Sequence, residues 1–150
     1  MVAPFYTFSL QTQYNSDEVR SKFKNIVNEG RPILKRMYAN DEFSSKPFCG
    51  SINGYNLKIS RIISNGNPVL PIIKIRIKEV DNSTCVKFYM RISMFAAFLI
   101  LLWFSVGIFM CIFADSLAPL IILLLGYLAV TIPFYIQSRN LKDYFAEMMI

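Results

Sequence analysis

The sequence predicts an α+β membrane protein: a small antiparallel β-sheet domain with one N-terminal helix, then a transmembrane α-hairpin and a C-terminal amphipathic helix. Two uncharged apolar runs, 92–113 and 117–136, are each about 20 residues long, which matches a hydrocarbon core of roughly 30 Å. Much of 47–91 alternates with the period of β-strands, whereas 16–29 and 138–150 follow the helical period. The expected organisation is a cytoplasmic α+β domain at 1–91, a membrane hairpin at 92–137 and a cytoplasmic amphipathic helix at 138–150.

The distribution of basic residues predicts the topology. Fourteen of the sixteen Lys and Arg residues precede Ile92, and the other two, Arg139 and Lys142, follow the second apolar run. The turn of the hairpin, at Asp115 and Ser116, has no basic residue. Because basic residues stay on the cytoplasmic side of a membrane, we expect both termini in the cytoplasm and the turn outside. The N-terminus lacks a basic region followed by an apolar stretch, so we expect no cleaved signal peptide.

A strand followed by a helix is expected at the N-terminus. Phe5–Gln13 alternates weakly, and Ser16 followed by acidic residues is a typical helix start. The helix should cover Ser16–Glu29, with Val27 on its apolar face, and end at Gly30. Residues 31–46 have no clear period and should form a connector.

Four further strands are expected: Phe48–Ile52, Tyr55–Ser64, Val69–Lys78 and Thr84–Arg91. Asn53-Gly54 predicts a tight hairpin between the first two, because both central positions of a type I′ turn need positive φ. The loop 65–68 separates the second strand from the third. The last strand leads directly into the first apolar run.

Apolar and basic residues alternate along the last two predicted strands, which predicts a basic face of the sheet. A register that keeps the apolar residues together pairs Ile75 with Val86 or Phe88. The opposite face then carries Lys74, Arg76, Lys78, Lys87 and Arg91. This face is a solvated surface, a contact for the lipid phosphate nearest to Arg91, or a contact for a nucleotide, nucleic acid or acidic protein. No nucleic-acid-binding motif accompanies it, so we expect no nucleic-acid partner.

The hairpin and the tail leave further alternatives. Both apolar runs lack ionisable residues, which favours an anchor over a carrier; an oligomer could still line a pore with Ser93, Ser105, Tyr127 or Thr131. Pro133 is a candidate kink near the end of the second run. The amphipathic tail could pack on the sheet, lie at the membrane interface, or bind a partner.

The residues that commonly carry catalysis or bind metals are scarce. The chain contains no histidine, which excludes Ser-His and Cys-His mechanisms and the common zinc sites. No phosphate-binding or nucleophile motif is present, and Asp41-Glu42 has no matched partner. The three cysteines form no C-x-x-C pair and are expected to be free. We therefore expect neither enzymatic activity nor a cofactor or metal.

Three segments carry a resemblance: FCGSINGYNLKISR (48–61), NPVLPIIKIRI (67–77) and TCVKFYMR (84–91), followed by the hairpin. They resemble small uncharacterised bacterial two-helix inner-membrane proteins with a cytoplasmic β-rich domain. The likeness covers about residues 48–136 and consists of alternation with a few Gly, Asn and Pro positions. It implies a bacterial inner membrane, makes Gly50, Asn67 and Pro71 structural positions, and brings no activity with it.

The function expected from these observations is binding. In the first hypothesis, a non-enzymatic membrane protein contacts a partner protein or anionic lipid head groups through its β-domain. In the second, a membrane-perturbing effector oligomerises through its hairpin when the soluble domain receives a signal. In the third, the chain is an accessory subunit of a larger membrane complex.

Overall fold

The computed structural model describes residues 4–29, 46–62, 71–80, 83–113 and 118–150. In these residues the fold is α+β, as predicted, with a six-stranded sheet and three helices. The strands are β1 (Phe5–Thr12), β2 (Val27–Asn28), β3 (Phe48–Asn53), β4 (Asn56–Arg61), β5 (Ile72–Val80) and β6 (Ser83–Arg91). The helices are α1 (Ser16–Ile26), α2 (Met94–Phe113) and α3 (Ala118–Met149). The predicted connector at 31–46, apart from Lys46, the loop at 65–68 and the hairpin turn at Asp115 and Ser116 lie outside the described residues.

The sheet is mixed, so the prediction of a purely antiparallel sheet was wrong at one edge. The strand order is β1-β6-β5-β4-β3-β2, and the β2–β3 pair is parallel while the other neighbours are antiparallel. The predicted helix ends at Ile26 rather than Glu29, because Val27 adopts an extended conformation and pairs with Phe48. Val27 is fully buried there. The burial of one β-branched side chain in the sheet therefore outweighs three further residues of helix.

The register of the central strands agrees with the prediction, whereas one turn differs. Ile75 lies opposite Phe88. In the β3–β4 hairpin, Asn53 pairs with Asn56, so the two loop residues are Gly54 and Tyr55 rather than Asn53 and Gly54. Gly54 has φ 59°, which both hairpin-type turns require at the first loop position. The tight turn is thus present, shifted by one residue.

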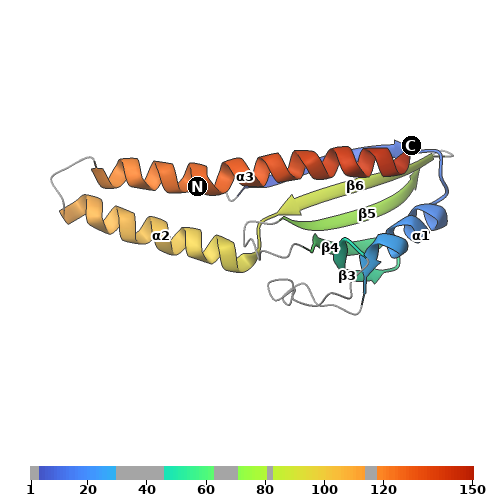
Figure 1. Cartoon of the computed structure of the whole chain (residues 1–150), viewed down its shortest axis with the longest axis horizontal. Coiled ribbons are helices and arrows are strands. Elements are labelled where there is room, and N and C mark those ends of the chain that lie inside the picture. The colour runs from blue at the N-terminus through green and yellow to red at the C-terminus, as the bar shows by residue number, and fades with distance from the viewer. Residues whose placement is uncertain (1–3, 30–45, 63–70, 81–82, 114–117) are drawn as a thin grey trace.

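The two helices α1 and α3 cover one face of the sheet (Figure 1). Phe145 of α3 lies at the centre of the core that these helices and the sheet enclose. The centroid of its ring is 5.0 Å from that of Phe88, 5.5 Å from that of Phe48 and 5.9 Å from that of Phe23. The core also contains Val19, Ile59, Ile73, Val86, Met90, Phe134, Leu141 and Met149. The amphipathic tail therefore packs on the sheet, which was one of its three predicted alternatives.

The second apolar run and the tail form one helix, not two. Helix α3 continues through Pro133 and past residue 137 for 32 residues, a length of about 48 Å. Tyr135 contacts Tyr6 at one end of β1, and the Thr12 hydroxyl donates to the Met149 carbonyl at the other end. Fourteen helical residues and six strand residues both span about 20 Å. The second half of α3 therefore runs alongside β1 in the same direction.

Side chains from the N-terminal part of the chain satisfy the last carbonyls of α3. The Lys22 ammonium donates to the Met148 carbonyl at 2.9 Å, and the Tyr14 hydroxyl donates to the Ile150 carbonyl at 3.2 Å. With the Thr12 bond, these contacts replace the partners that a helix C-terminus lacks. The charge of Lys22 also complements the negative end of the helix dipole.

Helix α1 begins at an Asn15 cap rather than at the predicted Ser16 cap. The Asn15 backbone N–H donates to Glu18 Oε2 at 3.1 Å, as in a capping box. The Ser16 hydroxyl instead donates to Glu79 of β5. This bond connects the start of α1 to the sheet.

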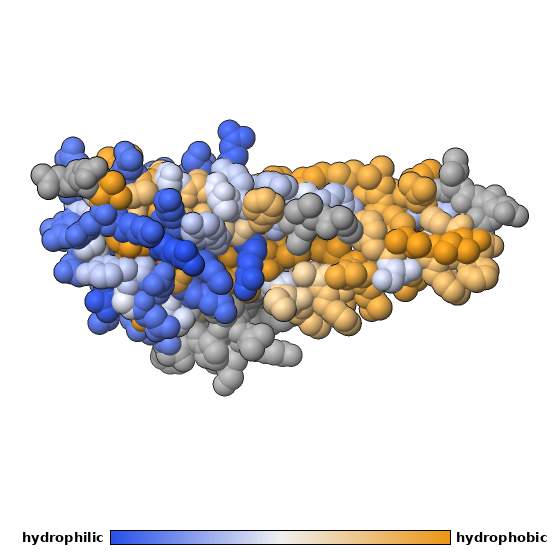
Figure 2. All heavy atoms as spheres, turned by 180° about the vertical axis from the view of Figure 1, so that it is seen from behind, coloured by the Kyte–Doolittle hydropathy of each residue, from blue (hydrophilic) through white to orange (hydrophobic). Residues whose placement is uncertain are grey.

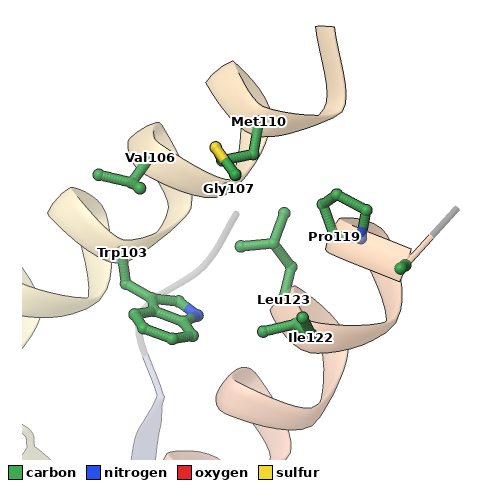
Figure 3. Close-up of a pocket in the computed structure, with 8 residues that line it drawn as sticks. Trp103, Val106, Gly107, Met110, Pro119, Ile122 and Leu123 are labelled. Atoms are coloured by element: carbon green, nitrogen blue, oxygen red, sulfur yellow. The ribbon is translucent and has the colours of Figure 1, made fainter. Parts of the chain in front are cut away.

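Helices α2 and α3 form an apolar hairpin that extends beyond the sheet (Figures 1 and 2). Both are long and apolar enough to cross a membrane, and only 6% and 11% of the residues in their most apolar stretches are buried. Ser93 caps α2, because its Oγ accepts from the Ala96 backbone N–H at 3.1 Å. Leu123 of α3 points toward Gly107 of α2, where an added Cβ would collide with it (Figure 3). Gly126 of α3 likewise faces Trp103 of α2, so a small residue on one helix lies against a large one on the other, which permits close helix packing.

Replacement of Phe145 by Ala should lower the free energy of unfolding of the whole chain by about 3–5 kcal/mol, because it removes an aromatic ring from the centre of the core. Denaturant unfolding in detergent, followed by near-ultraviolet circular dichroism, measures this. The matched control is Phe5→Ala, since Phe5 is 58% exposed and should cost about 1 kcal/mol or less. Equal losses in both variants would contradict the central position of Phe145.

Candidate functional site

The face of the sheet opposite the helices carries a cluster of basic side chains. Its members lie on β4, β5 and β6 and are all exposed: Lys58, Lys74, Arg76, Lys78, Lys87 and Arg91. The structure brings together all five residues that the sequence analysis placed on this face and adds Lys58 from the neighbouring strand. We refer to these six residues as the basic face.

The register places like charges directly opposite one another. Lys58 lies opposite Lys74, and Arg76 lies opposite Lys87. Directly opposite residues have Cβ atoms about 4.5–5.5 Å apart, so each pair is destabilising unless solvent or an anion screens it. Arg91 lies opposite Ile72, which makes it a diagonal neighbour of Lys74.

No carboxylate occupies the basic face in the described strands. Glu79 is the acidic residue of β5, and it lies on the other face, where it accepts the Ser16 hydrogen bond. The Arg76 guanidinium lies 5.8 Å from the centroid of the Tyr89 ring, a weak attraction for an exposed pair. The basic face therefore has an uncompensated positive charge among the described residues.

The residues of the basic face lie in successive cross-strand rows, which start near the hairpin and continue along β5 and β6 away from it. Arg91 is nearest to α2, which begins three residues later at Met94. Lys87 is about 13 Å farther along the strand, and Cys85, opposite Lys78, is about 20 Å farther. The charges therefore extend away from the hairpin rather than lying in a ring around its base.

Sequence reasoning missed Lys58 and Tyr89 as parts of this surface. The alternation of β4 already put Lys58 among polar positions, but the pairing of β4 with β5 was needed to place it beside Lys74. Tyr89 lies opposite Lys74 on the same face and is 39% exposed.

Two of the four side chains proposed for a pore donate to carbonyls of their own helices. Ser105 donates to the Leu101 carbonyl at 2.9 Å, and Thr131 donates to the Tyr127 carbonyl at 2.7 Å. These two hydroxyls therefore have partners without a water-filled path. A groove of about 300 Å³ between α2 and α3 is lined by apolar side chains such as Trp103, Met110 and Leu123 (Figure 3). Its lining supplies no acid, base or ligand chemistry.

The two structural positions that the resemblance implied, and that the structure describes, are both buried. A Cβ at Gly50 would collide with the Lys58 carbonyl of the paired strand, so this position requires glycine. Pro71 accepts a hydrogen bond at its carbonyl from the buried Ser60 hydroxyl. Asn67 lies outside the described residues.

Comparison of the chain with protein-family models, with curated proteins and with solved structures gives no match.

Replacement of Lys58 by Thr should raise the melting temperature in 10 mM salt and have a smaller effect in 500 mM salt, because it removes a like-charge pair that salt otherwise screens. The same holds for Lys74→Thr, and the double variant should gain less than the sum of the two. Thermal unfolding in a nonionic detergent measures this. Arg20→Gln on the exposed side of α1 is the control for net charge. Strictly additive or salt-independent gains would show that the two lysines do not interact.

Proposed function

We propose that this chain is a non-enzymatic, membrane-anchored binding protein that holds the basic face upright above the membrane surface for an acidic protein partner. The hairpin of α2 and the apolar half of α3 is the anchor. The exposure of its side chains supports this: Met94, Ile112 and Phe113 are more than 70% exposed, and many other large apolar residues of the hairpin are more than half exposed. Helices buried in the core of a soluble protein would not show such a surface.

The fold supports a topology with both ends of the chain on one side. Phe88 precedes the hairpin and Phe145 follows it, yet their rings stack in one core. Both segments must therefore lie on the same side of any membrane that the hairpin crosses. The basic residues of both segments favour the cytoplasmic side. The bacterial inner membrane, implied by the resemblance, completes the proposed location.

The single observation that carries the binding role is the alignment of α3 with β1. If the apolar half of α3 crosses the bilayer, its polar half and the parallel strand stand away from the surface by about 20 Å. The rows of Arg76, Lys87 and Lys78 then lie beyond direct contact with lipid head groups, since an exposed charge acts over roughly 8 Å at physiological salt. These rows are open to a partner in the aqueous phase.

The chemistry and size of this surface define the kind of partner. The basic residues span three strands, roughly 10 Å across and 20 Å along the sheet, which is small compared with a stable interface of about 800 Å² per partner. Long side chains of one sign favour fast, salt-sensitive association with a surface of opposite sign. An acidic protein segment bound transiently fits these properties.

The topology can be measured with single-cysteine variants in which Cys49, Cys85 and Cys111 are replaced by Ser. A cysteine at Asp115 should react with a membrane-impermeant maleimide in intact cells, whereas a cysteine at Tyr144 should react only after the membrane is opened. Reaction at both sites in intact cells, or at neither after opening, would contradict the proposed anchor.

Binding can be measured with the chain in nanodiscs of phosphatidylcholine and a fluorescent poly-glutamate peptide as the probe. The Arg76→Gln/Lys87→Gln variant should bind at least 10-fold more weakly than the wild type in 50 mM salt, and the difference should shrink in 300 mM salt. The control, Arg20→Gln/Lys24→Gln on α1, removes the same net charge and should bind as the wild type does. Equal weakening in both variants would show that net charge, not the basic face, attracts the probe.

A further inference from the structure

The membrane-proximal end of the basic face has a composition that differs from its distal rows. Here Lys74 and Arg91 lie beside Phe5 and Tyr89, which are 58% and 39% exposed. Phe5 pairs with Arg91 across β1 and β6, and Tyr89 pairs with Lys74 across β6 and β5. We refer to Phe5, Lys74, Tyr89 and Arg91 as the proximal patch.

The geometry of the proximal patch allows its two cations to converge on one anion. Arg91 and Lys74 are diagonal neighbours on adjacent strands, about 7–8 Å apart at their Cα atoms and within reach of each other's long side chains. Tyr89 lies between them, two residues before Arg91 on β6 and opposite Lys74. No carboxylate shares this part of the described sheet. The guanidinium can bind two phosphate oxygens at once, and the ammonium adds a point charge.

The molecule has a polar half and an apolar half (Figure 2). The proximal patch lies at the end of β6 that leads into the apolar helix α2, and therefore near the boundary between the two halves. Met94 and Phe95, which open α2, are 77% and 60% exposed and follow Arg91 within four residues. On the helical side, Tyr135 of α3 is 45% exposed and contacts Tyr6 of β1. Exposed aromatic residues at the end of an apolar span, with basic residues directly beyond it, are typical of the head-group layer of a membrane.

We propose that the proximal patch binds the phosphate group of an anionic phospholipid in the leaflet that faces the sheet. Arg91 and Lys74 bind the phosphate, Tyr89 contributes a hydroxyl at the depth of the head groups, and Phe5 lies against the upper acyl chain. A head group with a fixed cation, such as choline, is disfavoured because its charge would lie among Lys74, Arg91 and the nearby Arg76. This site rests on the proposed insertion of the hairpin, but it is separate from the distal rows assigned to an acidic protein.

The test compares lipid binding by native mass spectrometry of the chain in a nonionic detergent, titrated with phosphatidylglycerol or phosphatidylcholine. The wild type should bind the first phosphatidylglycerol at least 5-fold more tightly than phosphatidylcholine. The Lys74→Gln/Arg91→Gln variant should lose this preference, whereas Arg76→Gln/Lys87→Gln, which removes the same charge from the next row, should keep most of it. Circular dichroism verifies that each variant is folded.

Three outcomes would overturn the site. These are no preference in the wild type, a preference that survives in Lys74→Gln/Arg91→Gln, or equal losses in both double variants. Inorganic phosphate provides a further comparison: if it displaces phosphatidylglycerol at equal concentration, the patch recognises free phosphate rather than a lipid. The maleimide labelling described above separates the two proposals. A chain that does not insert fails both, while an inserted chain without lipid preference fails only this one.

Discussion

The continuity of α3 is the constraint on which the rest of the structure depends. One helix supplies half of the apolar hairpin and then places Phe145 among Phe23, Phe48 and Phe88 in the core of the sheet. Because α3 is helical without interruption through Pro133, the direction of the hairpin and the direction of the strands are linked through it. The hydrogen bonds from Thr12, Tyr14 and Lys22 hold its last turn against the N-terminal part of the chain. The sheet and the hairpin are therefore joined through α3 as well as through β6, which leads into α2.

This constraint separates two roles that can be proposed for the basic residues. A positive segment beside an apolar helix is enough to orient it in a membrane, wherever the charges lie on the segment. Orientation alone does not explain why six of them share one face of the sheet, in register and without a described carboxylate among them. Their alignment costs stability through repulsion between Lys58 and Lys74 and between Arg76 and Lys87. A surface of this kind is consistent with a ligand of opposite charge, and the upright sheet separates the row nearest the apolar surface from the rows beyond it.

Much of the fold could be predicted because its signals are local. The strands β1, β5 and β6 and the shared face of Ile75 and Phe88 follow from an alternation that would expose every apolar residue if it slipped by one position. The failures arose where tertiary contacts decided between conformations of similar local free energy. Val27 fits the apolar side of a helix and the buried side of a strand equally well, and only Phe48, 21 residues later, makes the strand preferable. Pro133 and the polar segment that follows residue 136 suggested a break between the second apolar run and the tail. The packing of Leu141 and Phe145 on the sheet keeps α3 helical instead.

The sequence by itself determined the local periods, the length of the apolar runs and the asymmetry of charge, because these depend only on neighbouring residues and on transfer between water and an apolar medium. From them follow the α+β class, an apolar hairpin and a basic side of the sheet. Only the tertiary structure decided that the tail packs on the sheet and that Lys58 joins the basic face with Tyr89 beside Lys74. It also decided that the rows of the basic face extend away from the hairpin rather than around the base of the hairpin. These features depend on contacts between residues far apart in the chain, such as Tyr6 with Tyr135 and Thr12 with Met149. A local pattern cannot specify which of several apolar faces a helix will cover, because each choice buries a similar area; the shape of the complete core selects one.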